Sequence, residues 1–291
     1  MTWLKRYLPP NAKTWQGRKD TPPNSCLFQL IKQHSLHHAL PVVTQYPTFA
    51  LIGFCSDTGI KRNLGRVGAF SGPLAIRERL AKLATHQPRL RCYDVGDIIC
   101  QHGRLEESQQ ALGEAVAYLL KQGYTPIVLG GGHEMAFGHY QGIIQSYARK
   151  KLGIINFDAH FDMRPLPIPH KGSSGTPFLQ IAQLAKKTHT PFDYTCIGIQ
   201  PASNTTHLFE IAKKYRVHTV LADSIHAQQT KAVQRVLKRA LRHNQSLYLT
   251  LCLDVFASSV APGVSAPQSL GLTPMQVIPL LRQCIRSQKI F

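Results

Sequence analysis

The stretch that decides the fold is residues 152–164, which reads Leu-Gly-Ile-Ile-Asn-Phe-Asp-Ala-His-Phe-Asp-Met-Arg. Its apolar half, residues 152–157, has the length and character of a buried strand in a parallel sheet. Side chains two residues apart in an extended chain point the same way, so Asp158, His160 and Asp162 are expected to project from one side. Three metal-ligand side chains would then lie within about one nanometre of chain, at ~3.3 Å per residue.

Two carboxylates and an imidazole on one side of a strand end are costly to bring together, because like charges repel and each charged group loses water. A divalent cation removes that cost, so the pattern favours a metal site. The Asp-x-His-x-Asp pattern alone is equally compatible with a polar turn after a strand. The residues that follow two other expected strands favour a metal site over a polar turn.

Two further expected strands end in metal-ligand side chains. Residues 125–129 lead into glycines at 130–132, which let the backbone turn sharply and deliver His133. Residues 247–253 carry Cys252 and continue to Asp254, and the two-residue spacing again predicts a common side. The carboxyl ends of parallel strands form the edge of the sheet where active sites lie. The candidate ligands are therefore His133, Asp158, His160, Asp162, Cys252 and Asp254.

This set of ligands is larger than one tetrahedral zinc ion would take, and it suits two metal ions that share ligands. A set rich in carboxylates and imidazoles favours Mn²⁺ over a metal that prefers soft ligands. Two metal ions about 3.5 to 4 Å apart lower the pKa of water enough to give hydroxide near neutral pH. The set therefore predicts hydrolytic attack on a planar carbon, without a serine or cysteine nucleophile.

From residue 49 onward, short apolar segments alternate with helical patterns, which predicts an α/β fold with a mostly parallel sheet. Residues 1–45 are rich in proline and are expected to form an irregular segment that wraps the domain. No linker is visible afterwards, so residues 46–291 are expected to form one catalytic domain, with a long loop at 57–72. The expected strands are 49–54, 90–95, 125–129, 152–157, 194–199, 217–221 and 247–253. The expected helices are 75–84, 106–122, 135–150, 178–185, 207–215, 230–243 and 274–286.

Composition narrows the functional class. The chain has 291 residues and a net charge of +19, but Lys and Arg are spread along helices without a nucleic-acid-binding motif. We therefore expect attraction to polyanions in dilute salt and no specific nucleic-acid partner. No segment approaches the ~18 consecutive apolar residues of a membrane helix, and residues 1–15 lack a signal sequence. Seven scattered cysteines without a Cys-x-x-Cys pair indicate reduced thiols and a cytoplasmic protein.

Several segments together resemble the ureohydrolase family of arginases and agmatinases, over nearly the whole chain. The resemblance implies a three-layer α/β/α sandwich of the arginase type, in which the matching histidines and aspartates bind two Mn²⁺ ions. It also implies that Asp158, His160 and Asp254 are the catalytic residues. The segments that carry the resemblance are residues 15–18, 63–69, 130–134, 157–164, 173–178, 203–205, 252–256 and 260–267.

The finer match is to the branch of this family that hydrolyses N-formimidoyl-L-glutamate to L-glutamate and formamide in histidine degradation. A substrate with two carboxylates needs cations and hydrogen-bond donors beside the metal ions. Arg164 follows Asp162 by two residues and is therefore expected on the ligand side. The other substrate-binding residues implied by the resemblance are Arg66, Ser174, Thr176 and Asn204.

The chain departs from the family pattern at three places. Cys252 stands where the family has an aspartate that bridges both metal ions, so the second metal site is in doubt, and a small buried apolar cysteine is the alternative. Phe178 stands where arginases have a histidine, which suits a substrate without a guanidinium group. Residues 286–291 resemble the opening of one more strand, through which the family continues to an acidic residue near the substrate.

These departures leave two alternatives open. One is another ureohydrolase, of the agmatinase or arginase type. The other is a catalytically impaired homologue with a structural or regulatory role, which Cys252 and the chain end at residue 291 favour. The oligomeric state also stays open, with a homo-oligomer among the options.

Overall fold

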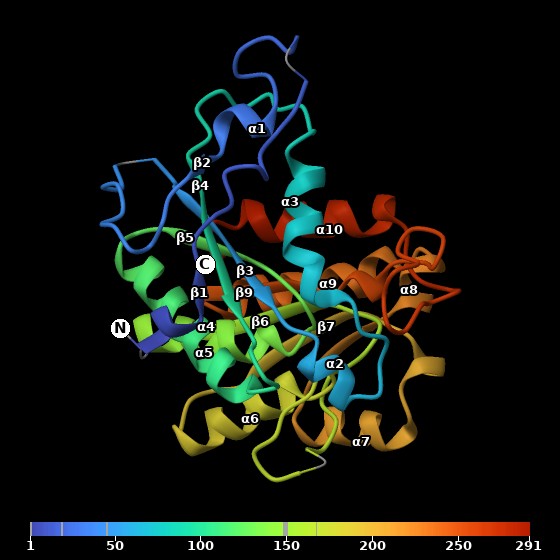
Figure 1. The fold of residues 1–291 in the computed structure, drawn as a ribbon. Helices are drawn as coiled ribbons and strands as arrows, with labels where there is room; N and C mark the ends of the chain where they lie inside the picture. Colours follow the sequence, from blue (N-terminus) through green and yellow to red (C-terminus); the bar gives the residue numbers. More distant parts are fainter. Residues whose placement is uncertain (1, 19, 45, 148–150, 167) are drawn as a thin grey trace. The chain divides into compact units, whose positions relative to one another are not determined.

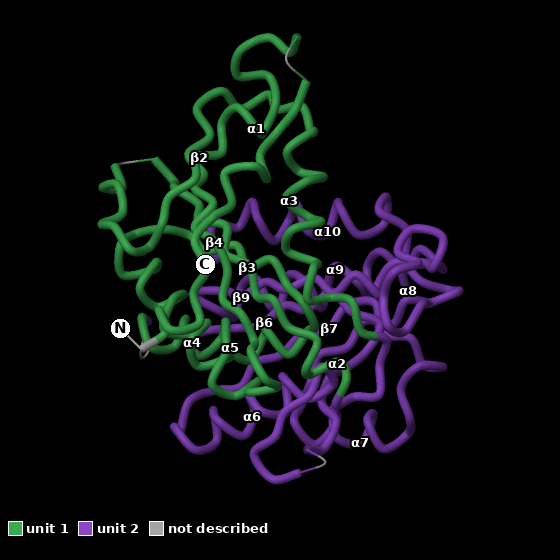
Figure 2. The backbone as a smooth tube through the Cα atoms, in the orientation of Figure 1, with its two compact units in different colours: residues 1–61, 67–146 green, residues 62–66, 147–291 purple. Residues whose placement is uncertain are grey.

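The computed structural model of the chain describes residues 2–18, 20–44, 46–147, 151–166 and 168–291. The chain divides into two compact units, which Figure 2 shows in different colours. Unit 1 comprises residues 1–61 and 67–146, and unit 2 comprises residues 62–66 and 147–291. The two units are described separately. The proposed division into a wrapping segment and one catalytic domain stays a prediction.

The sheet of unit 1 has three main strands, β3 (Phe49–Cys55), β4 (Cys92–Ile99) and β5 (Thr125–Leu129), and β3 runs parallel to both others. Two short strands from the N-terminal segment, β1 (Tyr7–Leu8) and β2 (Lys32–Gln33), both pair with β4. The N-terminal segment is mostly irregular, and it also contributes these two strands to the sheet.

Two helices of unit 1, α4 (Leu105–Lys121) and α5 (Met135–Ser146), pack against each other through glycines. A Cβ atom at Gly138 would lie 2.6 Å from the Gln109 carbonyl oxygen, and one at Gly142 would lie 2.5 Å from that of Gly113. The backbones approach so closely that no larger residue fits. This contact fixes α5, the helix that follows His133 in the sequence.

His139 of α5 is buried, and burial lowers its pKa to about 3 from the ordinary value of 6.5. Because the unfolded chain binds the extra proton between these two values, stability should fall as the pH drops below 6.5. The free energy of unfolding of the unmodified protein should fall more than that of His139→Leu between pH 6.5 and 5, by about 2 kcal/mol. Urea unfolding of both proteins at both pH values measures this difference. If stability depended equally on pH in the unmodified protein and in His139→Leu, the imidazole would not be buried in its neutral form.

Unit 2 contains an entirely parallel sheet with the strand order β8-β7-β6-β9. Its strands are β6 (Leu152–Phe157), β7 (Asp193–Ile199), β8 (His218–Leu221) and β9 (Ser246–Leu251). Ile290 adds an isolated parallel bridge to Leu247, in line with the strand opening expected near the end of the chain.

Helices cover both faces of the unit 2 sheet. On one face Phe178 of α6 (Pro177–Lys187) stacks on Tyr194 of β7, with the ring centroids 4.4 Å apart. On the other face Ile155 and Ile197 pack in one core cluster with α9 (Thr230–His243) and α10 (Pro274–Arg286). Because side chains alternate along each strand, the two helical layers contact different residues of the same strands. Unit 2 is thus a three-layer α/β/α arrangement (Figure 1).

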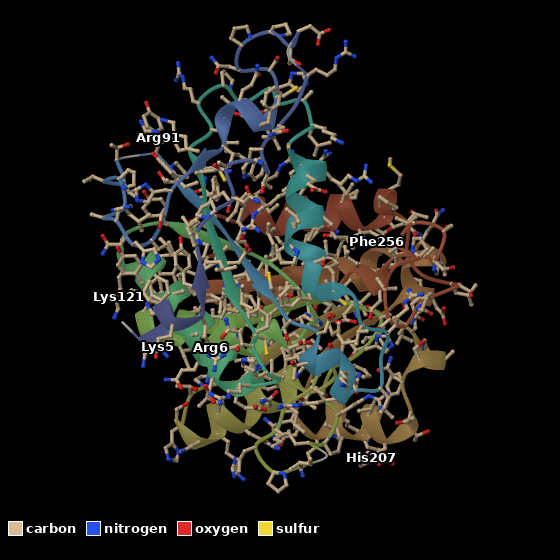
Figure 3. The ribbon with its side chains drawn as sticks, viewed as in Figure 1. Lys5, Arg6, Arg91, Lys121, His207 and Phe256 are labelled. Atoms are coloured by element: carbon tan, nitrogen blue, oxygen red, sulfur yellow. The ribbon has the colours of Figure 1, made fainter. Side chains whose placement is uncertain are left out.

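The remaining elements are short or peripheral. The other α-helices are α1 (Leu27–Leu30), α2 (Thr58–Arg62), α3 (Gly72–Leu80), α7 (Thr206–Lys214) and α8 (Ala222–His226). The 3₁₀ turns are η1 (Thr2–Arg6), η2 (Ala69–Ser71), η3 (Pro201–Ser203) and η4 (Leu253–Val255). No helix in the described ranges is long and apolar enough to cross a membrane. Figure 3 draws the side chains and labels Lys5, Arg91 and Lys121, which all belong to unit 1.

The fold class is confirmed as α/β with mostly parallel strands flanked by helices, and several boundaries differ from expectation. The strand expected at 90–95 is Cys92–Ile99, and the helix expected at 75–84 is Gly72–Leu80. The expected loop at 57–72 contains α2. The expected strand at 247–253 ends at Leu251, and a 3₁₀ turn follows. The helix expected at 135–150 ends at Ser146, while residues 148–150 lie outside the described ranges.

Candidate metal centre and substrate pocket

Asp158 lies at the carboxyl end of β6 and is completely buried. Its Oδ2 accepts a hydrogen bond from Asn156 Nδ2 at 3.0 Å, and its Oδ1 accepts one from the His160 backbone N–H at 2.8 Å. Both contacts stabilise a charged carboxylate inside the protein. Asp158 therefore has the fixed orientation that a metal ligand needs.

His160 and Asp254 complete a cluster around Asp158. His160 Nδ1 lies 3.1 Å from Asp254 Oδ2 and 3.6 Å from Asp158 Oδ1. One ligand atom from each of the three residues lies within 4.8 Å of the others, which is a separation that one cation can bridge. We call Asp158, His160 and Asp254 the acidic cluster.

The electrostatics of the acidic cluster favour a cation. Burial, reinforced by the charge of Asp158, raises the pKa of Asp254 to about 6. Burial by itself lowers the pKa of His160, but the hydrogen bonds and charges of Asp158 and Asp254 outweigh it and raise the pKa to about 11. The two carboxylates favour positive charge at this place, and hard oxygen and imidazole donors are ligands that Mn²⁺ accepts. These residues fit the expected metal.

Cys252 follows the end of β9, and its backbone N–H donates to the Phe157 carbonyl oxygen at 2.9 Å. Its Sγ lies within 4.8 Å of a carboxylate oxygen of Asp158. Burial first, and then the charges of Asp158 and Asp254, raise the pKa of the thiol. The two-residue spacing in extended chain was the wrong reason for placing Asp254 here, because η4 turns the backbone and delivers Asp254 instead.

We expect Cys252→Asp to keep or raise the affinity for Mn²⁺, because a hard carboxylate replaces a thiol whose pKa is raised. The affinity is measured by titration with MnCl₂, with free Mn²⁺ followed by its paramagnetic resonance signal. The control is Cys284→Ser, which changes another buried cysteine away from the cluster. Loss of Mn²⁺ binding or of activity in Cys252→Asp would show that the thiolate has a specific role.

Asp162 lies at a turn in the backbone. Its φ of 47° is left-handed, so the segment is no longer extended at this residue. Among the described residues, no group of three or more candidate ligands with atoms within 4.8 Å includes Asp162. Its charge nevertheless contributes to raising the pKa of Cys252. Its role as a metal ligand stays a prediction.

His133 belongs to unit 1, where β5 delivers it after a tight glycine turn. A Cβ atom at Gly131 would lie 2.4 Å from the Ser56 carbonyl oxygen, so the turn requires glycine. The next residue, Glu134, is completely buried and accepts hydrogen bonds from Ser56 Oγ at 2.9 Å and from the Gly59 N–H at 3.0 Å. Burial raises the pKa of Glu134 to about 7. The participation of His133 in the metal centre stays a prediction.

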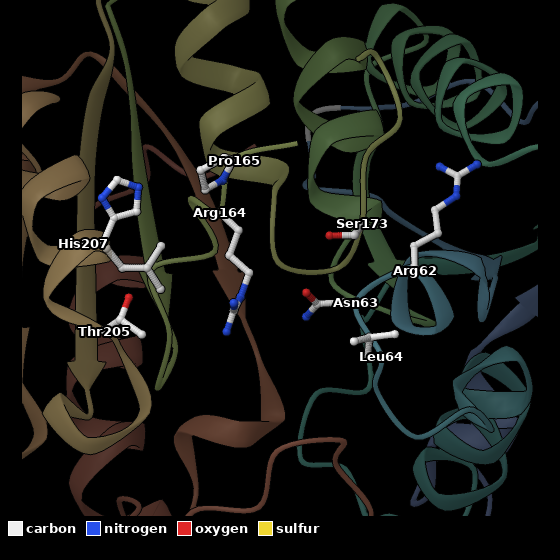
Figure 4. Close-up of a pocket in the computed structure, with 9 residues that line it drawn as sticks. Arg62, Asn63, Leu64, Arg164, Pro165, Ser173, Thr205 and His207 are labelled. Atoms are coloured by element: carbon white, nitrogen blue, oxygen red, sulfur yellow. The ribbon is translucent and has the colours of Figure 1, made fainter. Parts of the chain in front are cut away.

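A cavity of about 280 Å³ lies within unit 2 and contains Arg164 (Figure 4). The Arg164 guanidinium extends between Thr205 and His207 on one side and Asn63 on the other. Its guanidinium makes no hydrogen bond or ion pair with any described residue, so it is available to an anion. The residues that line the cavity are Arg62, Asn63, Leu64, Arg164, Pro165, Ser173, Thr205, His207 and Leu208.

Other predicted substrate-binding residues have structural contacts instead. Arg66 donates to the carbonyl oxygens of Pro262 at 2.9 Å and Val264 at 2.7 Å, and so holds one loop of unit 2. The completely buried Thr176 hydroxyl donates to Gln180 Oε1 at 2.9 Å. None of these side chains is among those that line the cavity.

Ser174 and Asn204 also fall outside the set of cavity-lining residues. Their immediate neighbours Ser173 and Thr205 line the cavity, as does Asn63 at the start of another quoted segment. The substrate-binding roles of Arg66, Ser174, Thr176 and Asn204 stay predictions. Phe178 is completely buried on Tyr194, so it acts as a core residue.

The fold and the acidic cluster together define an α/β protein with a candidate metal centre at a strand end. Residues 47–291 match the model of the Arginase family. The chain belongs to the arginase family.

Curated relatives and solved structures agree with this assignment. A formimidoylglutamase of Legionella pneumophila is 44% identical over 287 residues, covering 99% of this chain and 88% of that protein. A formimidoylglutamase of Clostridium tetani is 42% identical over 293 residues, covering 98% and 86%. The solved structure of Trypanosoma cruzi formiminoglutamase with Mn²⁺ gives a TM-score of 0.75 at 24% identity, covering 86% of this chain and 85% of that one. At that identity the likeness bears on the fold.

Proposed function

We propose that the chain hydrolyses N-formimidoyl-L-glutamate to L-glutamate and formamide with a pair of Mn²⁺ ions, as a step of histidine degradation. The two relatives named above, at 44% and 42% identity, are formimidoylglutamases, and they match almost the whole chain. The observation that carries the proposal is the acidic cluster, whose ligand atoms lie within 4.8 Å of one another, with Asp158 completely buried and His160 and Asp254 partly buried.

The proposed ligands are the acidic cluster and Cys252, with Asp162 and His133 completing the centre. When bound, the Mn²⁺ pair supplies hydroxide near neutral pH by lowering the pKa of water. Asp158 and Asp254 would hold the ions in a fixed orientation, because Asn156 and His160 constrain their carboxylates. Asp158, His160 and Asp254 are therefore the proposed catalytic residues.

The reaction needs no covalent bond to the protein. Hydroxide adds to the formimidoyl carbon, the bond from that carbon to the glutamate nitrogen breaks, and the nitrogen leaves with a proton as an amine. The carbon retains the oxygen and its other nitrogen, which gives formamide. The chain's task is to place the carbon beside the metal centre and to hold the two carboxylates of the substrate.

Arg164 is the proposed carboxylate ligand. Its guanidinium has no partner among the described residues, and it points into the cavity beside Asn63, Thr205 and His207. A guanidinium can form two parallel hydrogen bonds with one carboxylate. Gly175 leaves room for it, because a Cβ atom there would lie 2.9 Å from Arg164 Cδ.

The test is a substrate panel on protein reconstituted with Mn²⁺. Formamide release from N-formimidoyl-L-glutamate, with no urea from arginine or agmatine, supports the proposal. Urea release from a guanidino compound would instead show another ureohydrolase. Protein that binds Mn²⁺ and releases neither product would be an impaired homologue.

The proposal includes a cytoplasmic protein with a small-molecule substrate and without a specific nucleic-acid or membrane partner. All seven cysteines are free thiols in the structure, which is the usual state in a reducing compartment. A homo-oligomer is compatible with these observations, and light scattering of the purified protein would determine the state.

A further inference from the structure

Asn204 is 6% exposed, and its carboxamide forms hydrogen bonds through both of its polar atoms. Its Oδ1 accepts a hydrogen bond from the Phe161 backbone N–H at 3.2 Å. Its Nδ2 donates to the Ala159 carbonyl oxygen at 2.8 Å and to that of Gln200 at 2.8 Å. The side chain therefore binds the backbone on both sides of His160.

The backbone at His160 needs such support, because it lies beyond the end of β6 at Phe157. The sheet ladder no longer fixes the orientation of its peptide groups. The Gln200 N–H also donates to the Ala159 carbonyl oxygen, at 3.0 Å, so this oxygen is held from two sides. The direction of the His160 side chain follows from the peptide groups on either side of it.

The chain arrangement also explains why Asn204 itself is not in the cavity. Its side chain points to residues 159–161, whereas the neighbouring Thr205 lines the cavity with Arg164. Asn204 thus links the backbone around His160 to the segment in which Thr205 lines the cavity. Both N–H groups of the carboxamide are used by these backbone oxygens, so Nδ2 could contact a substrate only if one of these bonds were broken.

We infer that Asn204 is a positioning residue, which sets the affinity for the metal by clamping the backbone around His160, and is not a substrate ligand. This inference rests on the proposed Mn²⁺ centre. Groups that orient metal ligands typically change metal affinity by about 10- to 100-fold when removed. The loss of Asn204 should therefore weaken metal binding before it affects substrate binding.

The experiment compares Asn204→Ala and Asn204→Leu with Asn244→Ala as a matched control. Asn244 is a buried asparagine of the same unit, 2% exposed, and its Nδ2 donates to Asp193 Oδ2 and to the Ala240 carbonyl oxygen. Each protein is titrated with MnCl₂ while free Mn²⁺ is followed by its paramagnetic resonance signal. Thermal unfolding and the KM and kcat at saturating Mn²⁺ are measured alongside.

Asn204→Ala is expected to bind at least one Mn²⁺ about tenfold or more weakly, with KM at saturating Mn²⁺ within about twofold of the unmodified protein. Asn204→Leu should give the same loss, because it fills the space without the hydrogen bonds. Asn244→Ala should lower the unfolding temperature and leave Mn²⁺ affinity unchanged.

Unchanged Mn²⁺ affinity with a raised KM would overturn the inference and return Asn204 to the substrate site. Equal weakening in the Asn244 variant would also overturn it, because the effect would then be general destabilisation. If the unmodified protein itself bound no Mn²⁺, the proposed function would fail first, which separates the two failures.

Discussion

Replacement of Asp158 by alanine is expected to abolish both Mn²⁺ binding and formamide release. The Asp158 carboxylate is completely buried and shares a cluster with His160 and Asp254. Its removal deletes a charged ligand, leaves the His160 N–H without its Oδ1 acceptor, and removes one of the acceptors of the Asn156 amide. Loss of several kcal/mol of transition-state stabilisation corresponds to a rate reduction of about 10³-fold or more.

Elemental analysis of the purified variant measures bound manganese, and a formamide assay measures turnover. Asp193→Asn is a suitable control, because Asp193 lies at the opposite end of the sheet strands and binds Arg239 and Asn244. This control should lose stability and keep its manganese. A fully loaded and active Asp158→Ala protein would refute the proposed metal centre.

Replacement of Arg164 by leucine should raise KM for N-formimidoyl-L-glutamate and leave Mn²⁺ binding unchanged. The guanidinium has no hydrogen-bond or ion-pair partner among the described residues and extends into the cavity, so the substitution breaks no hydrogen bond or ion pair with them. A hydrogen bond between charged groups contributes about 1.5 to 3 kcal/mol. KM should therefore rise by roughly 10-fold or more.

Arg66→Leu distinguishes the two arginines that the sequence suggested for the substrate. Arg66 is occupied by the Pro262 and Val264 carbonyl oxygens, so its variant should lose loop stability and show a smaller change in KM. Arg242→Leu, an exposed change on α9, serves as a control for lost surface charge. A larger KM effect for Arg66 than for Arg164 would place the substrate outside the cavity.

Local sequence was sufficient for most of the elements. An apolar run followed at once by acidic residues predicted β6 and the position of Asp158, and both are correct. The reason is that a buried strand tolerates few charges, so the first charged residue marks its end. The same reasoning placed β5 before the glycine turn that carries His133.

Spacing arguments failed where the backbone was not extended. Asp162 has a left-handed φ, and Asp254 reaches the cluster from a 3₁₀ turn after β9 has ended. A two-residue period applies only within a strand, and neither residue is in one. Cys252 and Asp254 nevertheless lie near Asp158, because adjacent parallel strands bring their carboxyl ends to one edge.

By itself the sequence determined the α/β class, the chain order of strands and helices, and the set of side chains that can bind metal, because these depend on local patterns of polarity. Only the tertiary structure decided which polar residues face the cavity and which support the metal loop. Asn204 contacts residues 159–161 across more than forty positions of sequence, and Thr205 faces the cavity one position later. Which residues face the cavity and which support the loop depends on how the loops after β6 and β7 contact each other beyond the sheet. A local sequence pattern cannot predict that contact.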